Sequence, residues 1–134
     1  MTLNGLTLAY IGDAYYELAI RTYLIDKRLT SVNQLHRQAI RFTSGIAQSQ
    51  IMGHLMETHQ VTESEIELFK RGRNQSGPGR KNTSAKDYHQ ATGFEALIGH
   101  LYLHQKDRAD QLIGLAIDYI EKGDTHGKSS GQKE

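Results

Sequence analysis

Two acidic residues, Asp13 and Glu95, each lie in a short run of apolar and small residues, over positions 8–14 and 94–99. A carboxylate in such a run is costly to bury unless it is paired, hydrogen-bonded or bound to a metal ion. If the two runs meet in the fold, the acids form an oxygen-lined site suited to Mg²⁺. A divalent cation held by carboxylates neutralises phosphate charge and activates water. The pattern therefore predicts a metal-assisted hydrolytic site at Asp13 and Glu95.

Each acid also has a simpler interpretation. Asp13 can be a buried acid that a backbone amide caps or that pairs with Arg21, because structural ion pairs are common. Glu95 can be a half-exposed acid on a helix, and Glu17, one turn after Asp13, a solvated or paired residue. Gly12, beside Asp13, lets another backbone, an ion or a substrate approach closely. Taken singly, the two acidic runs leave both interpretations open.

Helices are the elements that must position these acids. The chain has a single proline and few alternating apolar and polar runs, so the pattern predicts an all-α protein. Capping signals are expected to open four helices, at Asn4, Ser31-x-x-Gln34, Thr62-x-x-Glu65 and Asp107. The first of these helices carries Asp13, and a fifth helix carries Glu95. Six helices are expected in total.

The remaining elements follow from apolar spacing and from glycine and proline positions. A third helix is expected over about residues 44–59, with Ile46, Ile51 and Leu55 facing inward. Three glycines and a proline over residues 71–82 predict a loop. A sixth helix is expected to stop at Gly123.

Length and composition bound the remaining possibilities. The 134 residues predict one domain over 1–123, followed by a polar tail over 124–134 that we expect to be disordered. The chain has no cysteine, which excludes disulfides, thiolate zinc sites and a cysteine nucleophile. Neither a secretory signal nor a membrane-spanning run is present in the sequence. A soluble, cytoplasmic protein is therefore expected.

Positive charge is concentrated between residues 70 and 86, although the formal net charge of the whole chain is only +1. No acidic residue interrupts this segment, whose cations are Lys70, Arg71, Arg73, Arg80, Lys81 and Lys86. Local field rather than total charge steers a polyanion, so the segment is a candidate for contact with nucleic acid. The simpler interpretation is a solvated loop that contacts nothing.

The two acidic runs together resemble the ribonuclease III family. Residues 10–14, followed by Glu17 and Leu18, resemble the signature helix of that family, and residues 94–103 resemble its second acidic helix. The segments 70–74 and 81–83 resemble the shorter branch called Mini-ribonuclease III, as does the pair Leu35-His36. The resemblance covers about residues 3–122 in the right order.

This resemblance implies the fold of the ribonuclease III catalytic domain and a dimeric, Mg²⁺-dependent endonuclease of double-stranded RNA. It implies 5′-phosphate and 3′-hydroxyl ends and a precursor of the large-subunit (23S) ribosomal RNA as substrate. Asp13 and Glu95 match the family's metal-binding catalytic acids. We expect no double-strand RNA-binding domain after residue 123, so that contact with the duplex falls to the six cations. Staggered cleavage of a duplex requires two sites related by a two-fold axis.

The chain departs from the family pattern at two positions. Ala9 and Thr92 stand where the family usually has a glutamate and an aspartate. These changes remove two carboxylates, and we expect water or Glu17 to take their place around the cation. They also motivate a second hypothesis, a non-catalytic, dimeric, helical RNA-binding module that keeps the fold.

Overall fold

The structure is a computed structural model that describes residues 3–77 and 84–132, with side chains described as far as residue 123. These residues form six α-helices and no strand. The helices are α1 (Gly5–Asp26), α2 (Val32–Thr43), α3 (Gly45–Glu57), α4 (Glu63–Gln75), α5 (Ala85–His104) and α6 (Lys106–Gln132). The predicted all-α class is confirmed. No helix in the described part of the chain has the length and apolar character needed to span a membrane.

Short-range hydrogen bonds start the helices where the capping signals predict. The Asn4 side chain accepts from the backbone amide three residues later at 2.8 Å, and Ser31 caps α2 in the same way at 3.4 Å. At α4 the box is reciprocal. The Glu65 amide donates to Thr62 Oγ1 at 3.1 Å, and the Thr62 amide donates to Glu65 Oε1 at 2.9 Å. The caps predicted at Asn4, Ser31 and Thr62 are confirmed, but the cap predicted at Asp107 is wrong, because α6 begins at Lys106 and Asp107 lies in its first turn.

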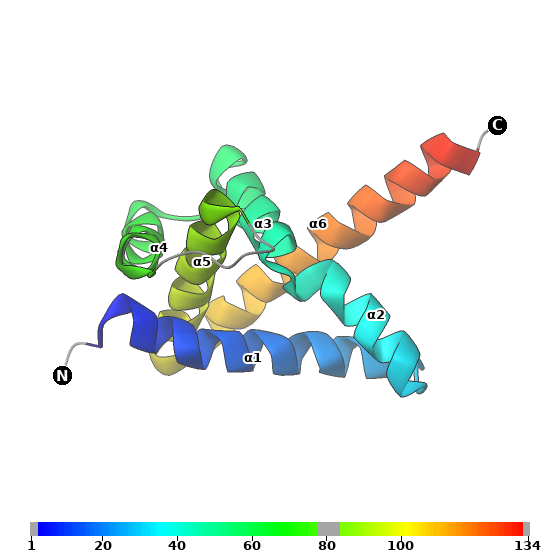
Figure 1. Ribbon diagram of the computed structural model, residues 1–134, viewed down its shortest axis with the longest axis horizontal. Helices are drawn as coiled ribbons and strands as arrows, with labels where there is room; N and C mark the ends of the chain where they lie inside the picture. The colour runs from blue at the N-terminus through cyan, green and yellow to red at the C-terminus, as the bar shows by residue number, and fades with distance from the viewer. Residues whose placement is uncertain (1–2, 78–83, 133–134) are drawn as a thin grey trace.

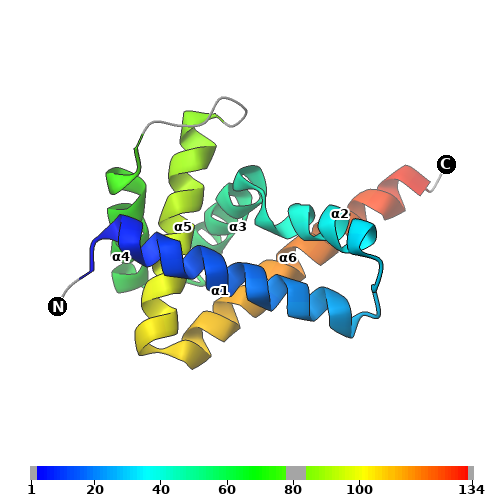
Figure 2. The same ribbon diagram turned by 60° about the horizontal axis from the view of Figure 1, so that its bottom comes forward.

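Helix α5 is the centre of the fold. It packs against α1, α3, α4 and α6, and α1 crosses it as shown in Figures 1 and 2. Its fully buried side chains join the main hydrophobic core and include Phe94, Leu97, Ile98 and Leu101. The middle of a helix surrounded in this way has little solvent-facing surface, so a charged residue there lies at a site that the surrounding helices define.

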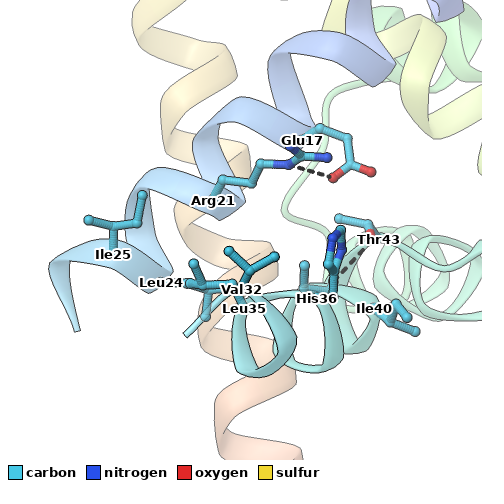
Figure 3. A pocket seen from close by; sticks show the side chains of 10 residues that line it. Glu17, Arg21, Leu24, Ile25, Val32, Leu35, His36, Ile40 and Thr43 are labelled. Carbon is cyan, nitrogen blue, oxygen red and sulfur yellow. Dashed lines mark hydrogen bonds and ion pairs between the residues drawn. The ribbon is translucent and has the colours of Figure 1, made fainter. Parts of the chain in front are cut away.

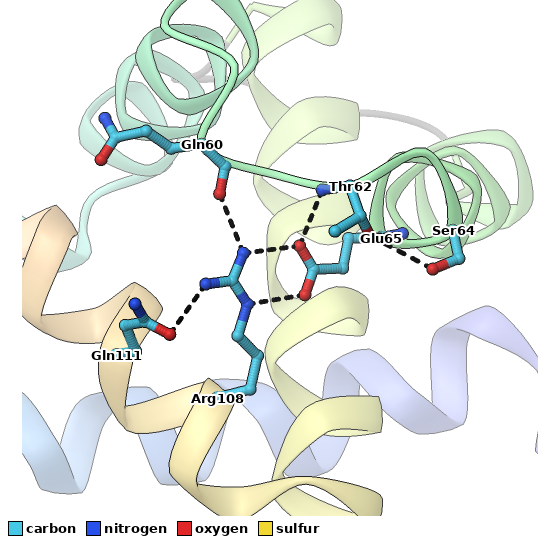
Figure 4. Close-up of polar contacts among 6 residues, drawn as sticks. All are labelled: Gln60, Thr62, Ser64, Glu65, Arg108 and Gln111. Carbon is cyan, nitrogen blue, oxygen red and sulfur yellow. Dashed lines mark hydrogen bonds and ion pairs between the residues drawn. The ribbon is translucent and has the colours of Figure 1, made fainter.

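A buried ion pair ties α4 to α6. The Arg108 guanidinium donates to both carboxylate oxygens of Glu65, at 2.7 and 2.8 Å, and to the carbonyl oxygen of Gln60 at 2.8 Å (Figure 4). The Glu65 carboxylate therefore accepts from Arg108 and from the Thr62 amide at once. The arginine holds the pKa of Glu65 below its usual range, chiefly through these hydrogen bonds. This network fixes the connection between α3 and α4 against the start of α6.

The inward face of α3 differs from the predicted one. Ile51 and Leu55 are fully buried as expected, but Ile46 is 51% exposed, so that assignment is wrong. The buried face instead contains Gln48, at i−3 relative to Ile51. Ile46 lies five positions before Ile51, and this spacing rotates Ile46 well away from the buried face of a helix with about 3.6 residues per turn.

Helix α4 extends into the segment predicted to be a loop. Residues 71–75 are helical, and the rest of the predicted loop falls partly in residues 78–83, outside the described residues. Gly72 explains the difference, because it serves packing rather than chain reversal. A methyl group on Gly72 would lie 2.5 Å from Cβ of Ala96 and 3.0 Å from Cα of Gly93. The glycine thus allows α4 and α5 to approach closely.

The last helix continues beyond the predicted stop. Helix α6 runs to Gln132, and Gly123 lies inside it. A glycine ends a helix when it adopts a left-handed conformation, and no described glycine has a positive φ angle. The predicted helix end at Gly123 is therefore wrong. The division into a domain over residues 1–123 and a tail over 124–134 stays a prediction.

Candidate active site

Two glycines bring the acidic helices into backbone contact. A methyl group on Gly12 of α1 would lie 1.8 Å from the carbonyl oxygen of Glu95, and one on Gly99 of α5 would lie 1.9 Å from the carbonyl oxygen of Leu8. Any larger residue at either position would push the helices apart. The predicted close approach at Gly12 is confirmed, and it places Asp13 on α1 next to Glu95 on α5.

The two acids line the same cavity. It has a volume of about 240 Å³, and its walls come from α1, α2, α3 and α5. Its lining residues are Asp13, Thr43, Gly45, Gln48, Tyr88, Ala91, Thr92 and Glu95. Asp13 is exposed and Glu95 is half-buried, so the cavity opens to solvent on the Asp13 side. Residues 82 positions apart in the sequence thus form one site.

The electrostatics of the cavity favour a positive partner. Burial raises the pKa of Glu95 to about 8, and the charge of Asp13 and a hydrogen bond to it add to the shift. Glu17 adds a smaller repulsion, and the Gln48 side chain opposes the shift. Two acids this close cannot both be ionised at low cost without a cation. The cavity therefore either holds a proton between its acids or binds positive charge.

Gln48 is a cavity residue that the sequence analysis missed. Its side chain is 2% exposed, and its Nε2 donates to the carbonyl oxygen of Thr43 at 3.0 Å. Among the buried side-chain nitrogen and oxygen atoms of the described residues, its Oε1 alone has no hydrogen-bond partner. One sequence signal could have found it. Gln48 shares a helical face with Ile51, Met52 and Leu55, where a polar residue is unexpected.

The residues present fit a magnesium ion. Within the described residues, no cluster of three or more Asp, Glu, His or Cys side chains is arranged to hold a metal. Mg²⁺ does not need one, because it keeps several of its waters and usually takes one or two carboxylates together with phosphate oxygens. Asp13 and Glu95 supply the carboxylates, and Gln48, whose Oε1 has no partner, lines the same cavity. The donor set is entirely oxygen.

The two positions that lack the family's acids have other roles in the structure. Ala9 is buried with Leu8 and Ala96 in a small apolar cluster. Thr92 lines the cavity, and its hydroxyl donates to the carbonyl oxygen of Tyr88 at 3.0 Å. The Ala9 position therefore contributes packing, and the Thr92 hydroxyl proton is engaged by its own helix.

Glu17 lies in a different place from the two acids. It lines a groove of about 320 Å³ between α1 and α2, where its carboxylate is 3.9 Å from Nε of Arg21 (Figure 3). Burial raises the pKa of Glu17, and Arg21 partly offsets this. The groove is mainly apolar and includes Leu24, Leu35 and other aliphatic residues. Glu17 does not line the cavity that holds Asp13 and Glu95.

The basic residues at the end of α4 are partly engaged within the chain. Arg71 donates to the carbonyl oxygen of Leu3 at 2.6 Å. The Arg73 guanidinium lies over the Phe69 ring, 5.5 Å from its centroid. Lys70 is exposed, and its Nζ is 3.7 Å from a carboxylate oxygen of the exposed Glu67. These contacts tie Arg71 to the segment before α1 and Arg73 to a ring of its own helix, and they leave Lys70 in solvent.

The basic segment leads directly into the helix that carries Glu95. Lys86 is exposed in the first turn of α5, two residues before the cavity residue Tyr88. Arg80 and Lys81 lie outside the described residues. The structure thus puts Lys86 at the same end of α5 as the cavity residues Tyr88, Ala91 and Thr92.

Comparison with known proteins agrees with this geometry. The model of the Ribonuclease III domain matches residues 6–106. A solved crystal structure of a Fusobacterium nucleatum protein superimposes with a TM-score of 0.75 and 28% identity, covering 86% of this chain and 92% of that one. This chain, in which α1 and α5 cross at an acid-lined cavity, therefore has the fold of a ribonuclease III catalytic domain.

Curated relatives narrow the class. Mini-ribonuclease 3 of Acholeplasma laidlawii is 46% identical over 93% of this chain and 100% of its own length. Mini-ribonuclease 3 of Clostridium tetani is 45% identical over 98% of this chain and 88% of its own length. The chain belongs to the ribonuclease III family, within its Mini-ribonuclease 3 branch. It is an endoribonuclease of a family whose substrate class is double-stranded RNA.

Proposed function

We propose that this endoribonuclease hydrolyses phosphodiester bonds of double-stranded RNA with Mg²⁺ held by Asp13 and Glu95, leaving 5′-phosphate and 3′-hydroxyl ends. The observation that carries the proposal is the single cavity that both acids line, although they come from helices far apart in the sequence. The pKa of Glu95, raised to about 8 by burial and by Asp13, supports the need for a cation there. The bound ion would supply charge neutralisation at the phosphate and a more acidic water.

The two acids have different tasks in this proposal. Glu95 is half-buried and is held on the central helix, so it fixes the place of the cation before the RNA arrives. Asp13 is exposed at the opening of the cavity. Its carboxylate is placed to accept a hydrogen bond from the attacking water and to orient it toward the phosphorus. The contact at Gly12 and Gly99 keeps the two carboxylates in register.

The basic segment grips the duplex beside the cavity. Duplex RNA is bound through its phosphates, 2′-hydroxyls and shape rather than through base edges. Lys70 on α4 and Lys86 in the first turn of α5 are exposed cations, and Lys86 is on the helix of Glu95. The full proposed set is Lys70, Arg71, Arg73, Arg80, Lys81 and Lys86. Because these contacts release counterions, we expect affinity for RNA to fall steeply with salt.

A second copy of the chain completes the enzyme in this proposal. One cavity cuts one strand, so cleavage of both strands requires two cavities related by a two-fold axis. Helix α1 offers an apolar surface for this contact, because Leu6, Tyr10, Leu18 and Ile25 are exposed large hydrophobic residues and Tyr10 is 82% exposed. These residues recur at spacings of four, eight and seven positions, along the helix that carries Asp13. A homodimer through α1 would bring the two sites near each other.

The substrate we propose is a precursor of the large-subunit (23S) ribosomal RNA, with the cytoplasm as the place of action. Support comes from the membership of this chain in the Mini-ribonuclease 3 branch. The resemblance to that branch is what implies this substrate. Incubation with 23S precursor transcripts and mapping of the new 5′ ends tests this assignment. Cleavage of unrelated duplexes at the same rate would contradict it.

The catalytic proposal is tested with a long labelled RNA duplex at low salt, in Mg²⁺ or in chelator. We expect Mg²⁺-dependent cuts with 5′-phosphate ends for the wild type and no cuts for Asp13→Asn. The matched control is Asp26→Asn, which alters an exposed aspartate at the end of the same helix and should cut normally. Cleavage by Asp13→Asn at the wild-type rate would refute the site. A wild-type protein that shifts the duplex but leaves it uncut would favour the non-catalytic module.

A further inference from the structure

The corner between α2 and α3 holds the backbone of the cavity wall in place. The buried Tyr16 hydroxyl donates to the carbonyl oxygen of Phe42 at 2.9 Å. One residue later, the carbonyl oxygen of Thr43 accepts from Gln48 Nε2 at 3.0 Å. Ser44 then caps α3 by accepting from the Ala47 amide at 3.1 Å. Consecutive residues of the corner are thus fixed, and the Gln48 amide has one defined orientation.

This orientation leaves Gln48 Oε1 as an acceptor without a donor. The Thr43 carbonyl needs an N–H, so the nitrogen end of the amide must face Thr43 and the oxygen end must face away. A buried acceptor without a partner is costly. When Asp13 and Glu95 are both ionised, the neighbouring groups of the cavity do not remove this cost, because carboxylates donate no hydrogen bond and the Thr92 hydroxyl donates to Tyr88. The missing partner must therefore come from outside the chain.

A hydrated cation can act as the partner of three oxygen groups that line one cavity. Asp13, Glu95 and Gln48 come from α1, α5 and α3, and all three line the same space. An anionic ligand would be repelled by the two carboxylates, whereas a hydrated divalent cation satisfies acidic and amide oxygens alike. Glu17 is a poorer candidate for this position, because it lies in the α1–α2 groove beside Arg21.

We propose that Gln48 Oε1 is the third protein oxygen of the divalent-cation site, bound to the ion or to one of its waters. The inference rests on the proposed Mg²⁺ site of Asp13 and Glu95. It assigns to α3 part of the task that the family's missing acids at Ala9 and Thr92 would perform. A neutral amide oxygen in this role lowers the negative charge of the site while it keeps the oxygen environment that Mg²⁺ prefers.

Gln48→Met tests the proposal by removing both amide atoms at nearly constant length. We expect its affinity for Mn²⁺, measured by electron paramagnetic resonance on the RNA-free protein, to fall roughly tenfold or more. The Mg²⁺-induced rise in its thermal unfolding temperature should shrink in parallel. The matched control is Gln90→Met on α5, which removes an amide that accepts from Ser49 at 2.7 Å but does not line the cavity. This control should keep wild-type affinity for Mn²⁺.

Gln48→Glu separates a cation contact from a purely structural role. A third carboxylate should make the protein less stable in chelator and bind Mn²⁺ at least as tightly as the wild type, with a larger stabilisation by Mg²⁺. A residue that only supports the Thr43 carbonyl would lower stability in both variants and leave the affinity for Mn²⁺ unchanged. Gln48→Glu also carries the test if Gln48→Met does not fold.

Comparison with Asp13→Asn distinguishes this inference from the proposed function. Weaker Mn²⁺ binding in both Asp13→Asn and Gln48→Met supports both. Weaker binding in Asp13→Asn with wild-type binding in a folded Gln48→Met overturns the role of Gln48 and leaves the site of the two acids intact. Wild-type binding in all of these variants overturns the cation site itself, and the inference with it.

Discussion

Glu65 and Glu95 are both glutamates on helices of one fold, yet their surroundings are opposite. The Glu65 side chain is 8% exposed and accepts two hydrogen bonds from Arg108 and one from the Thr62 amide. Its pKa is lowered, chiefly by the hydrogen bonds from Arg108. Glu95 faces a second carboxylate, and its pKa is raised to about 8, chiefly by burial. One carboxylate is fully satisfied by the chain, and the other is not.

The difference separates a structural acid from a functional one. A carboxylate that the chain satisfies completely has no capacity left for a ligand, and it stabilises the fold that surrounds it. A carboxylate beside a second acid and an unpartnered amide oxygen lowers the stability of the ligand-free protein and is available to a cation. Replacing either glutamate should therefore change a different property of the protein.

The largest effect is expected for Glu95→Gln. We expect the rate of duplex cleavage to fall on the order of a thousandfold or more, which corresponds to about 4 kcal/mol of lost transition-state stabilisation. The thermal unfolding temperature in chelator should stay at or above that of the wild type, because the amide is neutral without the proton that the buried Glu95 must take up beside Asp13. Cleavage assays and calorimetry on the same preparation check both parts. A large loss of stability would make Glu95 a structural acid like Glu65.

For Glu65→Ala we expect a smaller effect, and on stability rather than on the rate of cleavage. The free energy of unfolding should fall by about 3 kcal/mol, because the partly buried Arg108 loses its carboxylate partner. Cleavage per folded molecule should remain at the wild-type level well below the unfolding temperature. Urea unfolding checks the first part. The control is Glu67→Ala on the same helix, whose side chain is 72% exposed and which should change stability little.

The smallest effect is the pH dependence of the Glu65 contribution. Because its pKa in the folded protein lies below the ordinary value of 4.5, the group stabilises the fold above pH 4.5 and loses this contribution as the pH falls through the lowered value. The difference in unfolding temperature between the wild type and Glu65→Gln should thus be constant near neutral pH and shrink in acid. A difference that stays constant down to pH 2 would show that the ion pair does not set the stability.

Local patterns in the sequence predicted the features that neighbouring residues determine by themselves. The caps at Asn4, Ser31 and Thr62 were predictable because each uses a hydrogen bond between residues three positions apart. The all-helical class followed from apolar spacing in the same way. Asp13 and Glu95 were identifiable as candidates because a lone acid in an apolar run is visible without knowledge of its neighbours.

The tertiary structure decided the features that depend on which helices meet. Gly72 appeared to belong to a loop because a glycine that ends a helix and one that admits a neighbouring helix have the same local signal. Ile46 is exposed and Gln48 is buried because burial depends on which face of α3 meets α5. The sequence by itself determined the helices and supplied two acids. Only the crossing of α1 and α5, with α3 beside them, placed those acids and Gln48 around one cavity. Whether a polar atom such as Gln48 Oε1 lacks a hydrogen-bond partner depends on the groups that surround it in the fold.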